Sequence, residues 1–549
     1  MSGYDPIALG IHWDRLISIA DEIVTALVRT SFSTNVRESY DLSCILFDAK
    51  GRALAQGAYS VPSFTGTAPL TMRHMLERFP PDTLAEGDII ATNDPWLGTG
   101  HLFDINVMRP VFKSGRLVGY TMSITHLPDI GGGGFSAAAS EVYEEGLRLP
   151  VCRLAKAGRL NEELMEIIRT NVRVPEQTLG DIMANVACNE VGGRMLTEFM
   201  EEYAIADLAP LADAIIGFSE EAIRAELRRV PAGVYRNRIE VEGDQAPLTL
   251  AASVAIADGE ASIDFAGSSP AVRAAINVPY CYTRAIAAYA IKCLTTPKIP
   301  NNEGSVRPIL VAAPEGSVLN ALPPSPTGGR HIIGHFINPL IFGALAPALP
   351  DRVQADSGML NLINVQGTHP DGGGVSSIFF ASGGFGALAG MDGWATTPSP
   401  SNMTGTPIEA WENLTGMTIE RKALLVDSGG VGRYRGGLGQ EIVLRNDSGG
   451  TMTVSILAGR TEFPPMGLNG GGPGRRREIQ INGKTVHPKG RYRLEPGDVI
   501  ATFEAGGGGY GPPERRAQDA ILRDLAEGTV SEEAARRDYG HRPKKARRA

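Results

Sequence analysis

Cysteine is scarce in this sequence, and the few cysteines present form no recognisable binding motif. The 549 residues include five, with no C-x-x-C spacing among them. They are Cys44, Cys152, Cys188, Cys281 and Cys293. An odd number of scattered cysteines offers no structural zinc site, and it is typical of reduced thiols in a cytoplasmic protein.

Long apolar segments and a surplus of positive charge are also missing. No eighteen consecutive residues are all apolar, so we expect no membrane span. Residues 1–6 lack the charged and apolar regions of a signal peptide. The net charge of −9 argues against general nucleic-acid binding, and the basic tail at 542–548 is expected to be a solvated chain end. The remaining composition, 43% apolar and 21% charged, indicates a globular protein long enough for two or more domains.

Glycine, in contrast, is abundant and clustered. The 66 glycines include the runs Gly131–Gly134, Gly372–Gly374, Gly470–Gly472 and Gly506–Gly509 and the pair Gly383-Gly384. No run is followed by G-K-S/T, and none has the G-x-G-x-x-G spacing between a strand and a helix, so a nucleotide site is poorly supported. Because glycine permits positive φ and close backbone approach, the runs either line an active site or form tight loops.

The pattern of apolar residues predicts an α+β, multi-domain protein with antiparallel sheets and a β-rich C-terminal half. We expect helices at 12–30, 68–79, 161–172, 176–207, 209–229, 279–295, 330–349, 514–526 and 530–538. Strands or hairpins are expected at 40–55, 87–92, 234–242, 247–257 and 260–266, and at many places after 355. These elements suggest three regions: 1–230 with α/β character, 231–355 with a hairpin and helix, and 356–549 rich in strands and glycine.

The most informative stretch lies between Asn93 and Asp129, where two of only nine histidines fall close together. Residues 105–112 and 117–125 read as two strands joined by a turn at Lys113–Arg116. With the tip at Ser114 and Gly115, His126 would lie opposite Phe103, between His101 and Asp104. Neighbours across a strand pair are about 5 Å apart, so three potential metal ligands would converge.

The spacing of the first two candidates complicates this prediction. His101 and Asp104 are three residues apart, and an ideal strand would point them to opposite faces. The run Gly98-Thr99-Gly100 indicates irregular backbone that could re-aim His101. Imidazole with carboxylate suits zinc, iron or manganese; the competing interpretation is two ordinary hydrogen-bonded histidines at a strand end.

Two other features near histidines have open interpretations. Asp129 would act catalytically by accepting a hydrogen bond from a ligand imidazole, or it would cap turn amides before the glycine run. His331 and His335 share one helix face, but no glutamate follows His331 as in zinc proteases. We therefore expect the pair to line a pocket or an interface.

A series of motifs in this order resembles the hydantoinase B family, which includes B subunits of ATP-dependent N-methylhydantoinases and the C-terminal half of 5-oxoprolinases. The motifs cover nearly the whole chain. They are R-T-S-F-S-T-N-V-R-E-S-Y-D-L-S-C-I-L-F-D, N-D-P-W-L-G-T-G-H-L-F-D, H-L-P-D-I-G-G, E-V-Y-E-E-G-L-R-L-P, N-V-R-V-P-E-Q-T-L-G-D, D-S-G-G-V-G-R-Y-R-G-G-L-G and G-G-G-G-Y-G-P-P. The α subunits of acetone carboxylases are similar relatives.

The resemblance implies a cytoplasmic hydrolase of cyclic amides such as hydantoin, N-methylhydantoin, oxoproline or another lactam. A partner A subunit, with ATP and magnesium, would phosphorylate the substrate carbonyl, and this chain would hydrolyse the product with a metal-bound water. The family pattern maps a divalent zinc, manganese or iron onto His101, Asp104 and His126, with Asp41 as a further ligand. Arg37 would hold the phosphorylated intermediate, or it would form a structural ion pair. A hetero-oligomer such as A2B2 is expected.

Two other functions stay open on sequence alone. The chain could be a subunit of an ATP-dependent ketone carboxylase of the acetone or acetophenone type. It could also be a non-catalytic scaffold for the A subunit, in which case the site at His101 and His126 would hold no metal.

Overall fold

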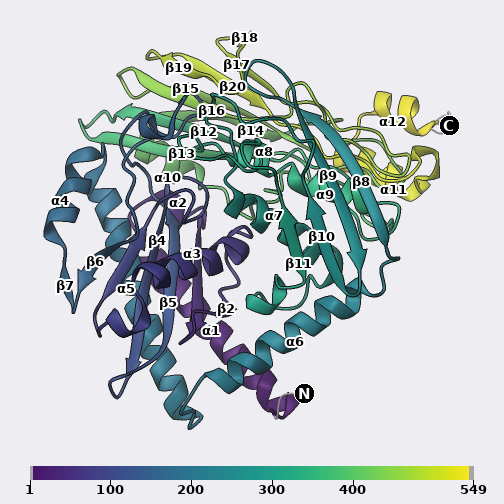
Figure 1. The fold of residues 1–549 in the computed structure, drawn as a ribbon. Helices are drawn as coiled ribbons and strands as arrows, with labels where there is room; N and C mark the ends of the chain where they lie inside the picture. The colour runs from purple at the N-terminus through teal and green to yellow at the C-terminus, as the bar shows by residue number, and fades with distance from the viewer. Residues whose placement is uncertain (1–3, 543–549) are drawn as a thin grey trace.

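Seven antiparallel strands form the sheet that carries the motif region (Figure 1). The computed structural model describes residues 4–542; the basic tail beyond Arg542 lies outside the described residues. The strand order is β2-β1-β5-β4-β3-β6-β7. The strands are β1 Leu42–Asp48, β2 Ala53–Gln56, β3 Ile89–Thr92, β4 Asp104–Lys113, β5 Arg116–His126, β6 Cys152–Lys156 and β7 Arg159–Leu160. Strands β4 and β5 are therefore central, and both of their faces are covered.

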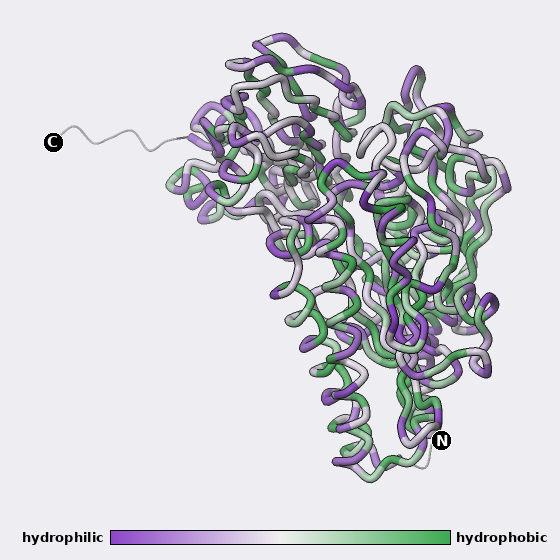
Figure 2. Tube along the Cα trace, turned by 90° about the vertical axis from the view of Figure 1, so that its left-hand side faces the viewer, coloured by the Kyte–Doolittle hydropathy of each residue, from purple (hydrophilic) through white to green (hydrophobic). Residues whose placement is uncertain are grey.

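Long helices cover one face of this sheet. Helices α1 (Pro6–Thr30), α5 (Pro175–Glu202) and α6 (Ala209–Leu227) share an apolar core with residues of β1, β4 and β5. Figure 2 shows hydrophobic and hydrophilic residues alternating along the long helices, as expected for helices with one buried face. The opposite face packs on α3 (Phe64–Arg78), the short helix α2 (Thr34–Arg37) contacts β5 of this sheet, and α4 (Glu162–Asn171) lies at the periphery.

Helix boundaries differ from the predicted ones for local reasons. Helix α1 begins at Pro6 rather than at residue 12, because the Asp5 side chain accepts a hydrogen bond from the Ala8 N–H and proline suits the first helical position. Helix α5 continues through Gly192, where a side chain would collide with Ile23 of α1. That glycine permits close helix packing instead of interrupting the helix.

A second sheet, of four strands in the order β11-β10-β9-β8, occupies the middle of the chain. Its strands are β8 Gly233–Val241, β9 Leu248–Ala257, β10 Glu260–Asp264 and β11 Ile309–Ala312. Asp258 and Gly259 both have positive φ in the β9–β10 turn, which confirms the predicted hairpin. Helix α7 (Tyr280–Thr295) matches its prediction. The helix expected at 330–349 is split into α8 (His331–Gly334) and α9 (Ile337–Leu345).

Two further sheets face each other as a sandwich in the C-terminal half. The first contains β12 (Leu360–Thr368), β13 (Gly374–Ser382), β16 (Met452–Leu457) and β19 (Arg491–Leu494). The second contains β14 (Met417–Leu424), β15 (Gln440–Asn446), β17 (Glu478–Ile481), β18 (Lys484–Thr485) and β20 (Val499–Phe503). Helices α10 (Ile408–Thr415), α11 (Gln518–Glu527) and α12 (Glu532–Tyr539) complete the half, and the Ser531 side chain caps α12 by accepting a hydrogen bond from the Ala534 N–H. The α+β, multi-domain prediction is confirmed.

Several glycine-rich segments of this half pack against one another, backbone to backbone, whereas Gly372 and Gly373 lie in the turn between β12 and β13. Four segments, around 383–386, 428–439, 467–474 and 505–511, exchange main-chain hydrogen bonds. The Gly384 N–H donates to Ala505 over 2.8 Å, and the Gly507 N–H donates to Gly437 over 2.9 Å. A Cβ atom at Gly507 would overlap the carbonyl group of Phe385. These glycines therefore serve close packing between loops.

Among residues 4–542, no helix has both the length and the apolar character that crossing a membrane requires.

Candidate metal centre

The β4–β5 hairpin sets the position of two of the predicted ligands. Its turn lies at Ser114 and Gly115, as expected, but an extra residue on β5 shifts the pairing. Val111 pairs with Gly119 and Phe112 with Leu117, so Val118 forms a bulge. As a result His126 lies opposite Asp104, and the predicted pairing with Phe103 is wrong by one residue. The bulge improves the convergence, because directly paired residues are the closest neighbours across a sheet.

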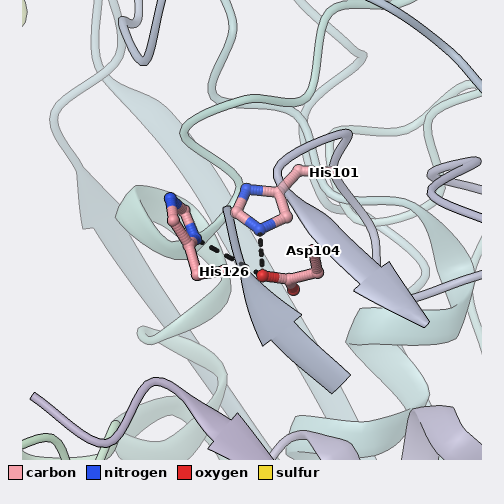
Figure 3. Close-up of side chains that lie close together, drawn as sticks. All are labelled: His101, Asp104 and His126. Carbon is pink, nitrogen blue, oxygen red and sulfur yellow. Dashed lines mark ion pairs between the residues drawn. The ribbon is translucent and has the colours of Figure 1, made fainter. Parts of the chain in front are cut away.

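His101 reaches the same point from outside the strand. Strand β4 begins at Asp104, and His101 lies in the preceding loop after Gly100, whose φ is +98°. A side chain at Gly100 would collide with Arg330. The loop thus frees His101 from strand alternation, as the glycines predicted, and turns its ring toward Asp104 (Figure 3).

Both histidines approach the same carboxylate oxygen of Asp104. Asp104 Oδ1 lies 2.8 Å from His101 Nε2 and 3.3 Å from His126 Nδ1 (Figure 3). The ligand atoms of the three residues all lie within 4.8 Å of one another, and all three residues are buried. The contact between His101 Nε2 and Asp104 does not have hydrogen-bond geometry, and this nitrogen has no hydrogen-bond partner. The lone pair of His101 Nε2 therefore points toward the space shared by the three ligands and is not used in a hydrogen bond with Asp104.

The tautomer of His101 is set by the main chain. Its Nδ1 lies 3.0 Å from the carbonyl oxygen of Gly328. A carbonyl can only accept, so Nδ1 carries the proton and Nε2 keeps its lone pair. Metal-binding histidines usually have this kind of support at the second ring nitrogen. The Gly328 N–H in turn donates to Glu145 over 2.6 Å, which fixes the position of that carbonyl.

Arg330 is the cation of the site, and it was not among the predicted site residues. Its Nη2 lies 2.8 Å from Asp104 Oδ2, and its Nε donates to the Thr99 carbonyl over 2.7 Å. Thr99 Oγ1 donates to the same Asp104 oxygen over 2.6 Å. Asp104 therefore has one oxygen held by Arg330 and Thr99 and the other facing the two histidines. The run T-G-G-R-H at 327–331, beside the predicted histidine pair, was the available signal.

Burial and charge determine the protonation of the cluster. Burial favours the neutral form of Asp104, but His101 and Arg330 outweigh it and hold the pKa of Asp104 well below its usual range. Burial and the nearby Arg330 lower the pKa of His101 to about 4. Burial raises the pKa of Asp41 to about 6. An ionised Asp104 beside a neutral His101 is the state in which both can donate electron pairs to a metal.

A cavity opens beside the cluster, and His101, Asp104 and His126 line it. Asp41 borders it, and its carboxylate lies 3.6 Å from His126 Nδ1. His331 and His335 also line it, in agreement with the pocket interpretation. Burial lowers the pKa of both, to about 3 for His335, so they are neutral.

The other two predicted residues lie elsewhere. Asp129 is fully buried, and its carboxylate accepts hydrogen bonds from the main chain and the guanidinium of Arg173, the latter over 2.8 Å. Neither imidazole of the cluster donates to it among the hydrogen bonds of residues 4–542. Arg37 ends α2 and is exposed, and it does not line the cavity. The charged residue that contacts the cluster is therefore Arg330, through Asp104, and not Arg37 or Asp129.

Replacing Arg330 by methionine is expected to destabilise the protein. Asp104 would lose its buried counter-ion, and breaking a buried ion pair from one side costs about 3–5 kcal/mol. Differential scanning fluorimetry should show a clearly lower melting temperature for Arg330→Met than for Arg330→Lys, which keeps the charge. Equal melting temperatures for the wild type and Arg330→Met would show that Arg330 does not stabilise Asp104.

Comparison with known proteins agrees with the fold and the motifs. The model of the family Hydantoinase B/oxoprolinase matches residues 5–513. The caprolactamase subunit beta of Pseudomonas jessenii is 31% identical, with 98% of this chain and 96% of that chain covered. The 5-oxoprolinase 1 of Arabidopsis thaliana is 30% identical over 92% of this chain, which spans 42% of that protein.

Solved structures show the same architecture. The crystal structure of the ATP-dependent caprolactamase from Pseudomonas jessenii superposes with a TM-score of 0.91 at 28% identity, covering 98% of this chain and 96% of that one. A nucleotide-free acetone carboxylase structure superposes with a TM-score of 0.89 at 19% identity, covering 98% of this chain and 79% of that one. The second likeness concerns the fold alone.

Proposed function

This chain belongs to the hydantoinase B/oxoprolinase family, and from that premise we propose that it is the B-type subunit of an ATP-dependent cyclic-amide hydrolase. Relatives with this fold are named caprolactamase and 5-oxoprolinase. The observation that carries the proposal is the convergence of His101, Asp104 and His126 on the wall of a buried cavity.

The reaction divides between two subunits for a chemical reason. An unactivated lactam is a poor electrophile, and phosphorylation of its carbonyl oxygen by a partner A-type ATPase, with ATP and magnesium, makes the ring carbon more electrophilic. This chain then receives the phosphorylated hydantoin, oxoproline or other lactam; water adds to the ring carbon, the ring C–N bond breaks with protonation of the nitrogen, and inorganic phosphate is released from the resulting acyl group by a second water, which leaves the ring-opened carboxylate. The relative named subunit beta supports such a pairing, and a hetero-oligomer such as A2B2 would keep the labile intermediate away from bulk water.

The residues of the cluster fit a divalent transition metal. Two imidazoles and a carboxylate are the donors that zinc, manganese and iron take, and Asp41 is a further ligand from the cavity wall. The buried Nε2 atom of His101, which faces the shared point, has no hydrogen-bond partner, and a purely structural histidine would rarely tolerate this. When bound, such a metal supplies Lewis-acid polarisation and lowers the pKa of water towards about 7.

The chain's own residues prepare the site for hydrolysis. Gly328 fixes the tautomer of His101, and Arg330 keeps Asp104 ionised and oriented. The positive charge of Arg330 also favours an anionic, phosphorylated substrate at the same wall. Apolar side chains from β12 and β13 line the cavity and limit the number of waters that contact the substrate.

ATP cleavage stimulated by a lactam tests the proposal. We expect it from the complex of this chain with its A-type partner, and none from the purified chain alone, because no phosphate-binding glycine motif is present. A coupled phosphate-release assay across lactams measures both. Lactam-stimulated cleavage by the isolated chain would overturn the division of labour. Cleavage that requires a ketone and bicarbonate would favour the carboxylase alternative.

A further inference from the structure

Two chemically different groups of residues line the cavity beside the cluster. The first is polar: His101, Asp104, His126, Asp41 and Arg330. The second is apolar: Val61, Phe64, Leu360, Leu362, Ile378 and Phe380. All six apolar residues are buried. A molecule that fills this space therefore meets both the polar cluster and a hydrocarbon surface.

Strand alternation builds the apolar wall. Leu360 and Leu362 are two residues apart on β12, and Ile378 and Phe380 are two apart on β13, so each pair shares a face. Leu362 and Phe380 are direct cross-strand partners. Ile363 and Phe379, which pair across the two strands next to Leu362 and Phe380, point to the opposite face and belong to the separate core of the C-terminal sandwich. The wall is thus one face of a rigid strand pair, which cannot easily turn polar groups toward a ligand.

The charges around the cavity leave no counter-ion for a second anionic group. Arg330 is the only lysine or arginine among the lining residues. Its guanidinium already contacts Asp104 and the Thr99 carbonyl, and it lies 4.4 Å over the ring of Tyr282. On the apolar wall, a carboxylate of the substrate would be desolvated without a partner, which is strongly unfavourable.

We propose that the substrate is a lactam whose ring carries only hydrocarbon away from the reacting amide, and that carboxylated lactams such as 5-oxoproline are rejected. This inference rests on the proposed function and specifies its substrate class. The amide is placed at the cluster, and the methylene groups of the ring pack against Leu362, Ile378 and Phe380. The apolar wall removes water from the substituents of the lactam ring, so it disfavours a ring with a charged substituent.

A matched pair of substrates tests the inference directly. 2-Pyrrolidinone and 5-oxoproline have the same ring and differ by one carboxylate. With the complex of this chain and its ATPase partner, we expect kcat/KM for lactam-dependent ATP cleavage to be at least about tenfold higher for 2-pyrrolidinone than for 5-oxoproline. Caprolactam should also be accepted.

Equal rates, or a preference for 5-oxoproline, would overturn the substrate class and leave the proposed function standing. If no lactam stimulates ATP cleavage, the proposed function fails and the inference fails with it.

A charge placed on the apolar wall should reverse the preference. Met403 lines the cavity from a loop, is 7% exposed and is unbranched, so a lysine of similar length can replace it with little repacking. Met403→Lys should raise the relative kcat/KM for 5-oxoproline at least about tenfold, whereas the neutral Met403→Gln should leave the ratio unchanged. An unchanged ratio in a folded Met403→Lys variant would contradict the placement of the ring against this wall.

Discussion

Replacing His101 by alanine is expected to remove the bound metal and to lower lactam turnover by about a thousandfold. The contact between His101 Nδ1 and the Gly328 carbonyl leaves the lone pair of the ring on Nε2. His101 Nε2 has no hydrogen-bond partner. Losing several kcal/mol of Lewis-acid stabilisation corresponds to about three factors of ten in rate. Plasma mass spectrometry measures the metal, and lactam-dependent ATP cleavage with the partner subunit measures the rate.

The control for this variant is a histidine outside the site. His74 lies on α3, is partly exposed and pairs with Glu77. His74→Ala should keep both metal and rate. Circular dichroism should show the same fold for both variants. Full metal occupancy with near-normal turnover in His101→Ala would remove His101 from the ligand set.

Replacing Gly507 by alanine is expected to destabilise the C-terminal half severely. The new Cβ would overlap the carbonyl group of Phe385, and the main-chain hydrogen bonds of Gly507 with Gly437 and Gly430 hold the segment in place. Overpacking of a side chain costs about 1–3 kcal/mol, and here the obstacle is backbone that cannot change rotamer, so we expect a larger cost. Soluble yield and thermal unfolding measure the effect.

Gly217 is the matched control, because it lies exposed within α6 with open space around it. Gly217→Ala should be neutral or stabilise the protein by up to about 1 kcal/mol, since alanine is the better helix former. A Gly507→Ala protein that melts at the wild-type temperature would show that the glycine loops are not tightly packed.

Local patterns predicted the ligand cluster, but not its register. The turn at Lys113–Arg116 and the alternation on both sides located the hairpin correctly. The bulge at Val118 escaped prediction because it depends on how β5 packs between β1 and β4, although Gly119 directly follows it. The glycines around Thr99 correctly indicated that His101 leaves the strand.

Contacts between distant segments explain what sequence patterns could not supply. Arg330 is 226 residues from Asp104, and the fold alone brings them together. The cavity wall from β12 and β13 is similarly remote in sequence. The glycine runs were recognisable as special backbone, yet their partners are other glycine runs, and no local rule pairs such segments. Arg37 and Asp129 lie within the motifs that contain Asp41 and His126, but nearness in sequence does not determine nearness in space.

The metal dependence of the wild-type complex tests the central claim most directly. After dialysis against a chelator, with magnesium then restored in excess for the ATPase partner, lactam turnover should be lost. It should return on addition of zinc, manganese or iron, with about one equivalent bound per chain. A complex that is free of transition metal and still hydrolyses the lactam at the full rate would contradict the assignment of His101, Asp104 and His126 as a metal centre.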